Sequence, residues 1–170
     1  NSYEKSIQIN PNYADAHYNL GIVLHELGEL HEAISCFEKT IQIEPNYADV
    51  HNNLGIVLQE LKEYQKAISC FQNSIQLNPS HTSAHNNLGI VLNELGEYQK
   101  AIGCYEKAIQ IDPNYTNAYY NLGNILQELW ELQKAKSCYE KLLNLDPANK
   151  KGFSNYGNLL LKVNQHNKGL

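Results

Sequence analysis

Four cysteines are the side chains in this sequence best suited to covalent or metal chemistry. They recur at intervals of 34 residues, at Cys36, Cys70, Cys104 and Cys138. If they occupy equivalent places on stacked helices, they lie roughly 8–10 Å apart, beyond the about 7 Å between Cα atoms that a disulfide bond tolerates. Zinc sites use close pairs such as Cys-x2-4-Cys, and no such pair occurs. We therefore predict structural thiols, no bound metal and a reducing, cytoplasmic location.

The remaining candidates for catalysis do not form a recognisable set. His81 and His85 are four residues apart, but they fall on either side of a predicted loop–helix junction. The sequence has no Ser-His-Asp, Cys-His or paired-carboxylate motif with a neighbouring pocket signal, and no glycine-rich phosphate loop. We predict a protein that is not an enzyme and that uses no cofactor.

The charge and hydropathy of the chain argue against two classes of partner. The net charge is −5 and arginine is absent, whereas nucleic-acid binding requires clustered basic side chains. No run of about 18 apolar residues, which a membrane span needs, is present. We predict that the chain binds neither nucleic acid nor membrane. Because it starts at Asn1 rather than at methionine, we also expect it to be part of a longer protein.

A repeat of 34 residues organises the whole chain. Prolines recur at this interval at 11, 45, 79, 113 and 147, and glycines at 21, 55, 89, 123 and 157. Four full units follow from this spacing, at 14–47, 48–81, 82–115 and 116–149. Residues 1–13 match the end of a preceding repeat, and residues 150–170 match the first helix of a fifth repeat or a C-terminal cap.

The pattern within each unit predicts two helices. In the first unit, residues 14–27 place four side chains on one helical face, namely His17, Leu20, Gly21 and Leu24. Gly28 and Glu29 interrupt this pattern as a tight turn would, and residues 30–43 carry a second apolar stripe. Pro45 ends the second helix because it lacks a backbone N–H. Asp15 or Asn46 is expected to cap the start of a first helix.

The unit resembles the tetratricopeptide repeat, whose pattern combines an aromatic residue, Leu-Gly, Ala-x3-aromatic and Pro at fixed spacings. The first unit reads His17-x2-Leu20-Gly21-x2-Leu24, Ala33-x3-Phe37 and Pro45, and the fourth reads Tyr119-x2-Leu122-Gly123-x2-Leu126, Ala135-x3-Tyr139 and Pro147. The departures are His17, His51 and His85 at the first aromatic position. The resemblance implies a single all-α domain, a right-handed superhelical α-solenoid of stacked helix-turn-helix repeats whose first helices line the concave face.

A row of asparagines is the strongest candidate for a binding site. It comprises Asn19, Asn53, Asn87, Asn121 and Asn155. At about 100° per residue, the stripe that contains Asn19 lies opposite the apolar stripe of its helix, so we expect the row to face the concave groove. The other predicted groove residues are Tyr18, Asn52, Asn86, Tyr120, Asp15, Asp49, Ile22, Ile56, Ile90, Glu26, Glu60 and Glu94.

The chemistry of the amide group indicates what such a row can bind. An amide donates to a peptide C=O and accepts from a peptide N–H, at about 0.5–1.5 kcal/mol for each bond. The row therefore predicts weak, sequence-tolerant binding of an extended peptide, and acidic neighbours such as Asp15 and Asp49 favour a neutral to basic partner. Alternatively, the amides only cross-link neighbouring helices.

Three functions are compatible with these features. The first is a non-catalytic scaffold for protein–protein interaction. The second is the substrate-recruiting segment of a larger enzyme, because asparagine ladders hold peptide backbones in the similar repeat arrays of O-linked N-acetylglucosamine transferases. The third is a self-assembly module whose unmatched ends stack end to end, which we expect in crystals. The basic residues of the carboxylate clamp found in chaperone-binding members of the family are missing around Asn19 and Asn53.

Overall fold

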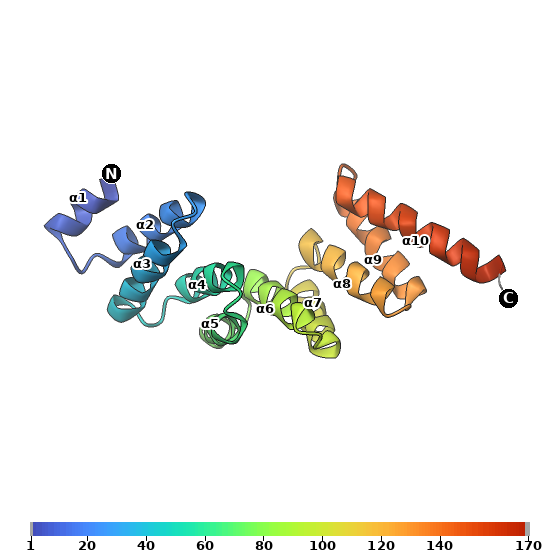
Figure 1. The fold of residues 1–170 in the computed structure, drawn as a ribbon, viewed down its shortest axis with the longest axis horizontal. Coiled ribbons are helices and arrows are strands. Elements are labelled where there is room, and N and C mark those ends of the chain that lie inside the picture. Colours follow the sequence, from blue (N-terminus) through green and yellow to red (C-terminus); the bar gives the residue numbers. More distant parts are fainter. Residues whose placement is uncertain (1, 169–170) are drawn as a thin grey trace. The chain divides into compact units, whose positions relative to one another are not determined.

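The computed structural model describes residues 2–168, which form ten α-helices with no β-strand among them (Figure 1). The helices are α1 (Ser2–Ile9), α2 (Ala14–Glu26), α3 (Leu30–Ile43), α4 (Ala48–Glu60), α5 (Tyr64–Leu77), α6 (Thr82–Glu94), α7 (Tyr98–Ile111), α8 (Thr116–Glu128), α9 (Leu132–Leu145) and α10 (Lys150–Lys168). The pairs α2–α3, α4–α5, α6–α7 and α8–α9 each form a helix-turn-helix. The predicted all-α, stacked helix-turn-helix class is therefore confirmed.

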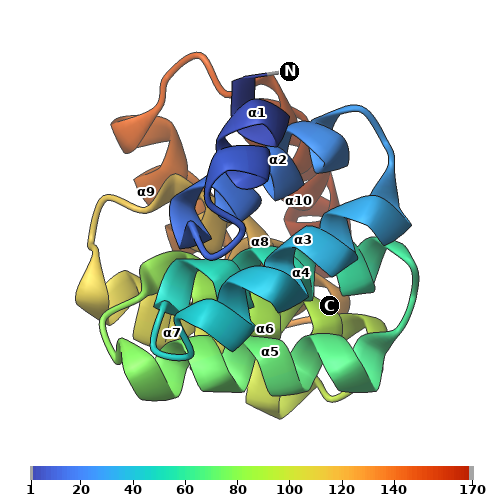
Figure 2. The same ribbon diagram turned by 90° about the vertical axis from the view of Figure 1, so that its left-hand side faces the viewer.

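The chain forms two compact units, of which the first ends at Val91 and the second begins at Leu92. In the first unit, α1 packs beside α2 (Figure 2), and α2, α3 and α4 each pack against the next helix. In the second unit, α8 packs against α7 and α9, and α10 packs against α9. The division falls inside α6, and the predicted repeat boundaries stay a prediction.

The turn residue of each repeat adopts the same left-handed backbone conformation. Gly28 has φ +80° and Gly96 has φ +76°, and Lys62 and Trp130 adopt the same left-handed conformation with φ 61°. In the first turn, the Gly28 N–H donates to the His25 carbonyl at 2.9 Å, and the Glu29 N–H donates to the Leu24 carbonyl at 2.9 Å. These bonds satisfy the last carbonyls of the helix. The predicted turn at 28–29 is thus the end of α2 in a Schellman motif.

The loop between repeats is closed by an acidic or amide side chain before the proline. Oδ1 of Asn78 accepts from the Ser80 N–H at 3.1 Å, and Oδ1 of Asp112 accepts from the Asn114 N–H at 2.9 Å. The expected capping by Asp15 or Asn46 is wrong, because Tyr13 and Tyr47 occupy the N-cap positions and make no side-chain capping bond.

In the repeats at 14–47, 48–81 and 116–149, an aromatic ring of the second helix packs onto a glycine of the first. Phe37 and Phe71 are fully buried, as is Tyr139. A Cβ atom added at Gly55 would lie 2.6 Å from Cε1 of Phe71, closer than two carbon atoms can approach without strain. Only glycine therefore fits at this helix crossing.

The histidines at the first aromatic position tie the helix to the preceding loop. Nε2 of His17 lies 3.0 Å from the Pro11 carbonyl oxygen, and Nε2 of His51 lies 3.2 Å from that of Pro45. The Tyr119 hydroxyl donates to the Pro113 carbonyl at 3.3 Å. Histidine and tyrosine replace one another here because both carry a donor at the far end of a ring.

Replacing His51 with phenylalanine is expected to lower the free energy of unfolding by about 0.5–1.5 kcal/mol, because the Pro45 carbonyl loses its donor. His51→Tyr, which keeps a donor as Tyr119 does, is expected to cost less. Urea unfolding followed by circular dichroism measures both. Equal losses from the two substitutions would mean that the ring, and not the hydrogen bond, accounts for the stability.

Candidate binding face

The asparagines of the row are half-buried in all five repeats. Their predicted neighbours fall into three groups. Exposed side chains are Asp15, Asp49, Glu26, Glu60 and Glu94, and half-buried ones are Tyr18, Tyr120, Ile22, Ile56 and Ile90. Asn52 and Asn86, with exposed fractions of 6% and 3%, are buried. The structure therefore leaves these two amides little surface for a ligand.

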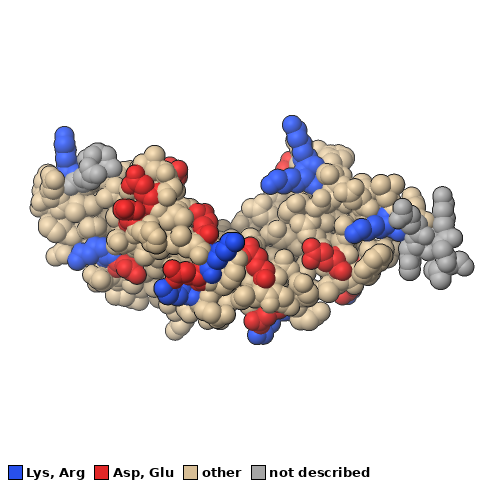
Figure 3. Space-filling model, in the orientation of Figure 1, with Lys and Arg blue, Asp and Glu red and all other residues tan. Residues whose placement is uncertain are grey.

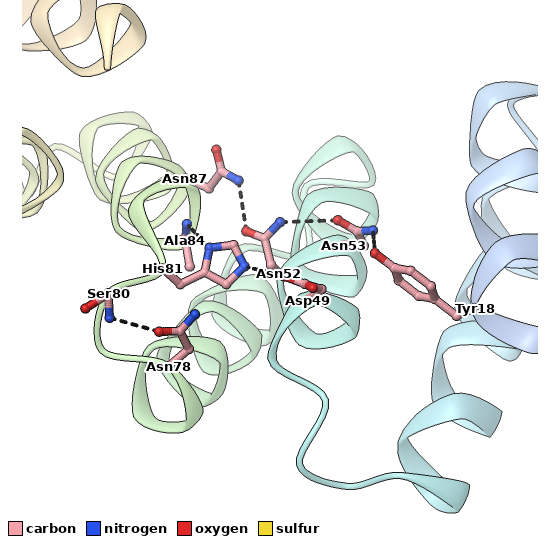
Figure 4. Close-up of polar contacts among 9 residues, drawn as sticks. All are labelled: Tyr18, Asp49, Asn52, Asn53, Asn78, Ser80, His81, Ala84 and Asn87. Atoms are coloured by element: carbon pink, nitrogen blue, oxygen red, sulfur yellow. Dashed lines mark hydrogen bonds and ion pairs between the residues drawn. The ribbon is translucent and has the colours of Figure 1, made fainter. Parts of the chain in front are cut away.

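A continuous hydrogen-bond chain connects five polar side chains of the first unit, and Figure 4 shows four of them, Tyr18, Asn52, Asn53 and Asn87. Nδ2 of Asn86 donates to Oδ1 of Asn87 at 3.3 Å, and Nδ2 of Asn87 donates to Oδ1 of Asn52 at 3.1 Å. Nδ2 of Asn52 donates to Oδ1 of Asn53 at 3.2 Å, and Nδ2 of Asn53 donates to the Tyr18 hydroxyl at 3.0 Å. We call these five residues the asparagine chain. It joins α6 to α4 and α4 to α2.

Within the first unit, the asparagines of the row are bonded through the residue that precedes each of them. Tyr18 bridges to Asn53, and Asn52 bridges to Asn87 of the next repeat. Cross-links between neighbouring helices were one of the two alternatives for this row, but the intermediary residue was not predicted. A signal for it exists, since the bridging positions are all tyrosine or asparagine, side chains that both donate and accept.

The chain leaves hydrogen-bonding capacity on its outer members. An amide has two N–H donors and two acceptor lone pairs. Asn53 and Asn87 each use one N–H and one lone pair within the asparagine chain, so one of each remains. Asn19 differs, because its Nδ2 donates to the Asp15 carbonyl of its own helix at 2.8 Å. The best-supported donors and acceptors for a ligand are therefore on Asn53 and Asn87.

In the second unit, the nearest hydrogen-bond partner of Asn155 is the amide of Asn124. Nδ2 of Asn155 lies 2.7 Å from Oδ1 of Asn124 and 3.4 Å from the Tyr120 hydroxyl. The same Oδ1 accepts from the buried Tyr139 hydroxyl at 2.7 Å. Asn124 replaces the isoleucine found at 22, 56 and 90. A buried phenol needs a partner, and Asn124 provides one for Tyr139.

The carboxylates around the face differ in their partners. Oδ1 of Asp49 lies 3.0 Å from Nε2 of His81, and Oε1 of Glu60 lies 2.8 Å from Nε2 of His25. Acidic side chains gather over the α2 region of the face shown in Figure 3. Burial raises the pKa of Tyr18, and the nearby Tyr47 and Asp49 raise it further. Tyr18 therefore acts as a neutral hydroxyl that accepts from Asn53.

The four cysteines are unpaired and half-buried. Burial raises the pKa of the Cys70, Cys104 and Cys138 thiols from 9.0 to about 11, and it raises that of Cys36 as well. Within the described residues, no three His, Cys, Asp or Glu side chains are grouped as a metal site requires. None of the described helices combines the length and apolarity needed to cross a membrane.

Comparison with known proteins places these features in a family. Models described as tetratricopeptide repeats match residues 14–47, 46–114 and 80–148. The crystal structure of MamA is 29% identical and covers 88% of this chain and 87% of its own, with a TM-score of 0.78. The comparison with curated proteins gave no match.

Two further solved structures, each 22% identical, share the fold. PilF of Pseudomonas aeruginosa covers 99% of this chain and 82% of its own with a TM-score of 0.82. YrrB, described as a tetratricopeptide repeat protein with an unusual peptide-binding site, covers 100% and 88% with a TM-score of 0.79. Because the family models together span residues 14–148, the chain belongs to the tetratricopeptide repeat family.

Proposed function

We propose that this chain is a non-catalytic scaffold that binds an extended segment of another protein along the asparagine chain. The observation that carries the proposal is the spare N–H and lone pair on Asn53 and on Asn87. Together they offer two donors and two acceptors to a peptide backbone, on amides whose orientation is already fixed by neighbouring repeats. Fixed groups lose less conformational freedom on binding than free side chains do.

Burial supports a division of roles among the four amides. Asn53 and Asn87 are half-buried, so they contact the segment, whereas Asn52 and Asn86 are buried and position them. Ile56 and Ile90 follow three residues after the contacting asparagines. At this helical spacing they lie on the same face and add apolar contact without demanding a particular side chain. The predicted specificity is therefore for an extended backbone.

The test uses peptides selected by the intact chain from a random dodecapeptide display library. Asn53→Ala with Asn87→Ala is expected to weaken the binding of a selected peptide by at least about tenfold, since two to four bonds of about 0.5–1.5 kcal/mol each are lost. Fluorescence anisotropy measures the Kd. Asn12→Ala with Asn73→Ala removes two exposed asparagines of the same unit and serves as the matched control.

Two further measurements separate backbone recognition from a merely structural role. N-methylation of single peptide bonds in the selected peptide removes one backbone donor at a time, and it should weaken binding at alternate residues of an extended segment. Asn52→Leu should weaken binding although Asn52 is buried, because it frees its two neighbours to rotate. Unchanged affinity of the Asn53, Asn87 double variant, with helicity intact, would show that the asparagine chain only cross-links helices.

A further inference from the structure

The first repeat contains a hollow of about 520 Å³ beside the start of the asparagine chain. It is lined by Asp15, Ile43, Glu44, Pro45, Asn46 and Tyr47. Ile43 and Pro45 supply apolar surface, Tyr47 supplies an aromatic ring, and Asp15 and Glu44 supply carboxylates that are both exposed. This combination of aliphatic, aromatic and anionic groups matches a long side chain with an apolar stem and a cationic end.

The aromatic wall of the hollow is anchored in the core. The ring centroids of Tyr47 and Tyr18 are 4.9 Å apart, and those of Tyr18 and the buried Phe37 are 6.1 Å apart. Tyr18 also ends the asparagine chain, because its hydroxyl accepts from Asn53. A segment bound at Asn53 therefore passes beside the hollow, and one of its side chains can enter it.

Among the described residues, the carboxylates of the hollow have no counter-ion. Of the lysines and histidines that the structure describes, none lies within ion-pair distance of Asp15 or Glu44. Burial raises the pKa of Tyr47, and Asp15, Asp49 and Glu44 raise it further. Three carboxylates thus disfavour ionisation of the Tyr47 hydroxyl, which stays neutral.

The next repeat provides an internal comparison. The residues equivalent to Asp15, Glu44 and Tyr47 are Asp49, Asn78 and His81. There the histidine lies against the carboxylate, with Nε2 of His81 3.0 Å from Oδ1 of Asp49. The second repeat supplies a partner for its own aspartate, whereas the first leaves Asp15 and Glu44 open to a cation from outside.

We propose that the hollow beside Tyr47 takes the side chain of a lysine or arginine in the bound segment, which fixes the register of a partner otherwise held by its backbone. This inference rests on the proposed function, since it requires a segment at Asn53. The side-chain stem lies on Ile43 and Pro45, and the cation lies between the Tyr47 ring and the carboxylates of Asp15 and Glu44. The asparagine chain then supplies general affinity and the hollow supplies selectivity.

The test uses three decapeptides of serine, threonine and glutamine that differ at one central residue, which is lysine, norleucine or glutamate. Their binding to the isotope-labelled chain is followed by NMR titration. The lysine peptide is expected to bind about tenfold more tightly than the norleucine peptide, a preference typical of a cation at an aromatic and anionic site. Asp15→Asn with Glu44→Gln should reduce this preference to less than about twofold and leave norleucine binding unchanged.

Two controls keep this inference separate from the proposed function. Glu32→Gln with Glu38→Gln removes the same charge from exposed positions of α3 outside the hollow, and it should keep the lysine preference. Tyr47→His should lose the preference, because the new histidine reproduces the pairing of His81 with Asp49. If the lysine and norleucine peptides bind equally, and their binding still depends on Asn53 and Asn87, the proposed role of the hollow is wrong and the proposed function stands. No binding of any peptide would overturn both proposals.

Discussion

Replacing Gly55 with alanine is expected to lower the free energy of unfolding by about 1–3 kcal/mol, the usual cost of overpacking a core. The new Cβ would meet Cε1 of Phe71 at 2.6 Å and Cδ1 at 2.8 Å. The ring cannot move away easily, because Phe71 is fully buried and lies next to the core of its own repeat. The helix must therefore shift away from α5, which loosens the packing of the whole repeat. Urea unfolding, with the midpoint and slope fitted together, measures the loss.

Gly157 provides a control at the same position of the repeat pattern. It lies in the interior of α10, and an added Cβ would meet nothing within 4 Å. Gly157→Ala is therefore expected to raise the free energy of unfolding by about 0.5–1 kcal/mol, because alanine loses less backbone entropy in a helix. If Gly→Ala lowers the free energy of unfolding at Gly55 and raises it at Gly157, the contact with the Phe71 ring is the cause of the loss. A loss at both positions would mean that the glycine is needed for another reason.

A second control replaces the ring with a smaller, flexible side chain. Phe71→Leu removes Cε1 and Cζ, two of the three atoms that the new Cβ would meet, so Gly55→Ala should cost less in that background than in the native chain. The difference between the two costs is the coupling energy of the pair, and residues in contact couple by about 0.5–3 kcal/mol. A coupling near zero would place the strain elsewhere in the helix pair.

The helices of this chain could be predicted closely because two independent signals agree. The apolar stripe of residues 14–27 has the helical period, and the 34-residue spacing of Gly21 and Pro45 repeats the same punctuation along the chain. The structure ends α2 at Glu26 and places α3 at Leu30–Ile43, close to the expected 14–27 and 30–43. The left-handed turn residue was visible where it is Gly28 but not where it is Lys62 or Trp130, because these residues adopt that conformation at a cost of about 1–2 kcal/mol.

The details of the binding face could not be predicted, because they depend on the register between helices. A helical wheel places Asn53 relative to Leu54 of its own helix, but it does not give the distance from Asn53 to Tyr18, which is 35 residues away on α2. The roles of Asn52 and Asn53 therefore looked alike in the sequence, and burial separates them. The capping prediction failed for a similar reason. The side chains of Asn10, Asn78, Asp112 and Asp146, each before a proline, close their loops, and Tyr13 and Tyr47 occupy the N-cap positions.

The four cysteines, which are the sequence's candidates for covalent chemistry, are expected to be nearly unreactive in the folded chain. The thiolate is the reactive form, and a pKa of about 11 instead of 9.0 for Cys70, Cys104 and Cys138 lowers its fraction by about a hundredfold at neutral pH. Alkylation by iodoacetamide, followed by intact-mass spectrometry near pH 8, should be slower in the folded chain by about this factor than in the same chain unfolded in urea. The unfolded chain is the matched control because it contains the same thiols.

The raised pKa of these thiols also fixes the direction in which the stability of the fold changes with pH. The folded chain holds these protons more tightly than the unfolded chain, whose thiols have the ordinary pKa of 9.0. Their contribution to stability is therefore complete below that pH, and it is lost as the pH rises towards about 11. Buried Tyr139, whose pKa is also raised by burial, changes stability in the same direction. If a thiol reacts as fast in the folded chain as in the unfolded one, its environment differs from the half-buried position beside the core ring. Covalent chemistry would then again be a candidate function for the four cysteines.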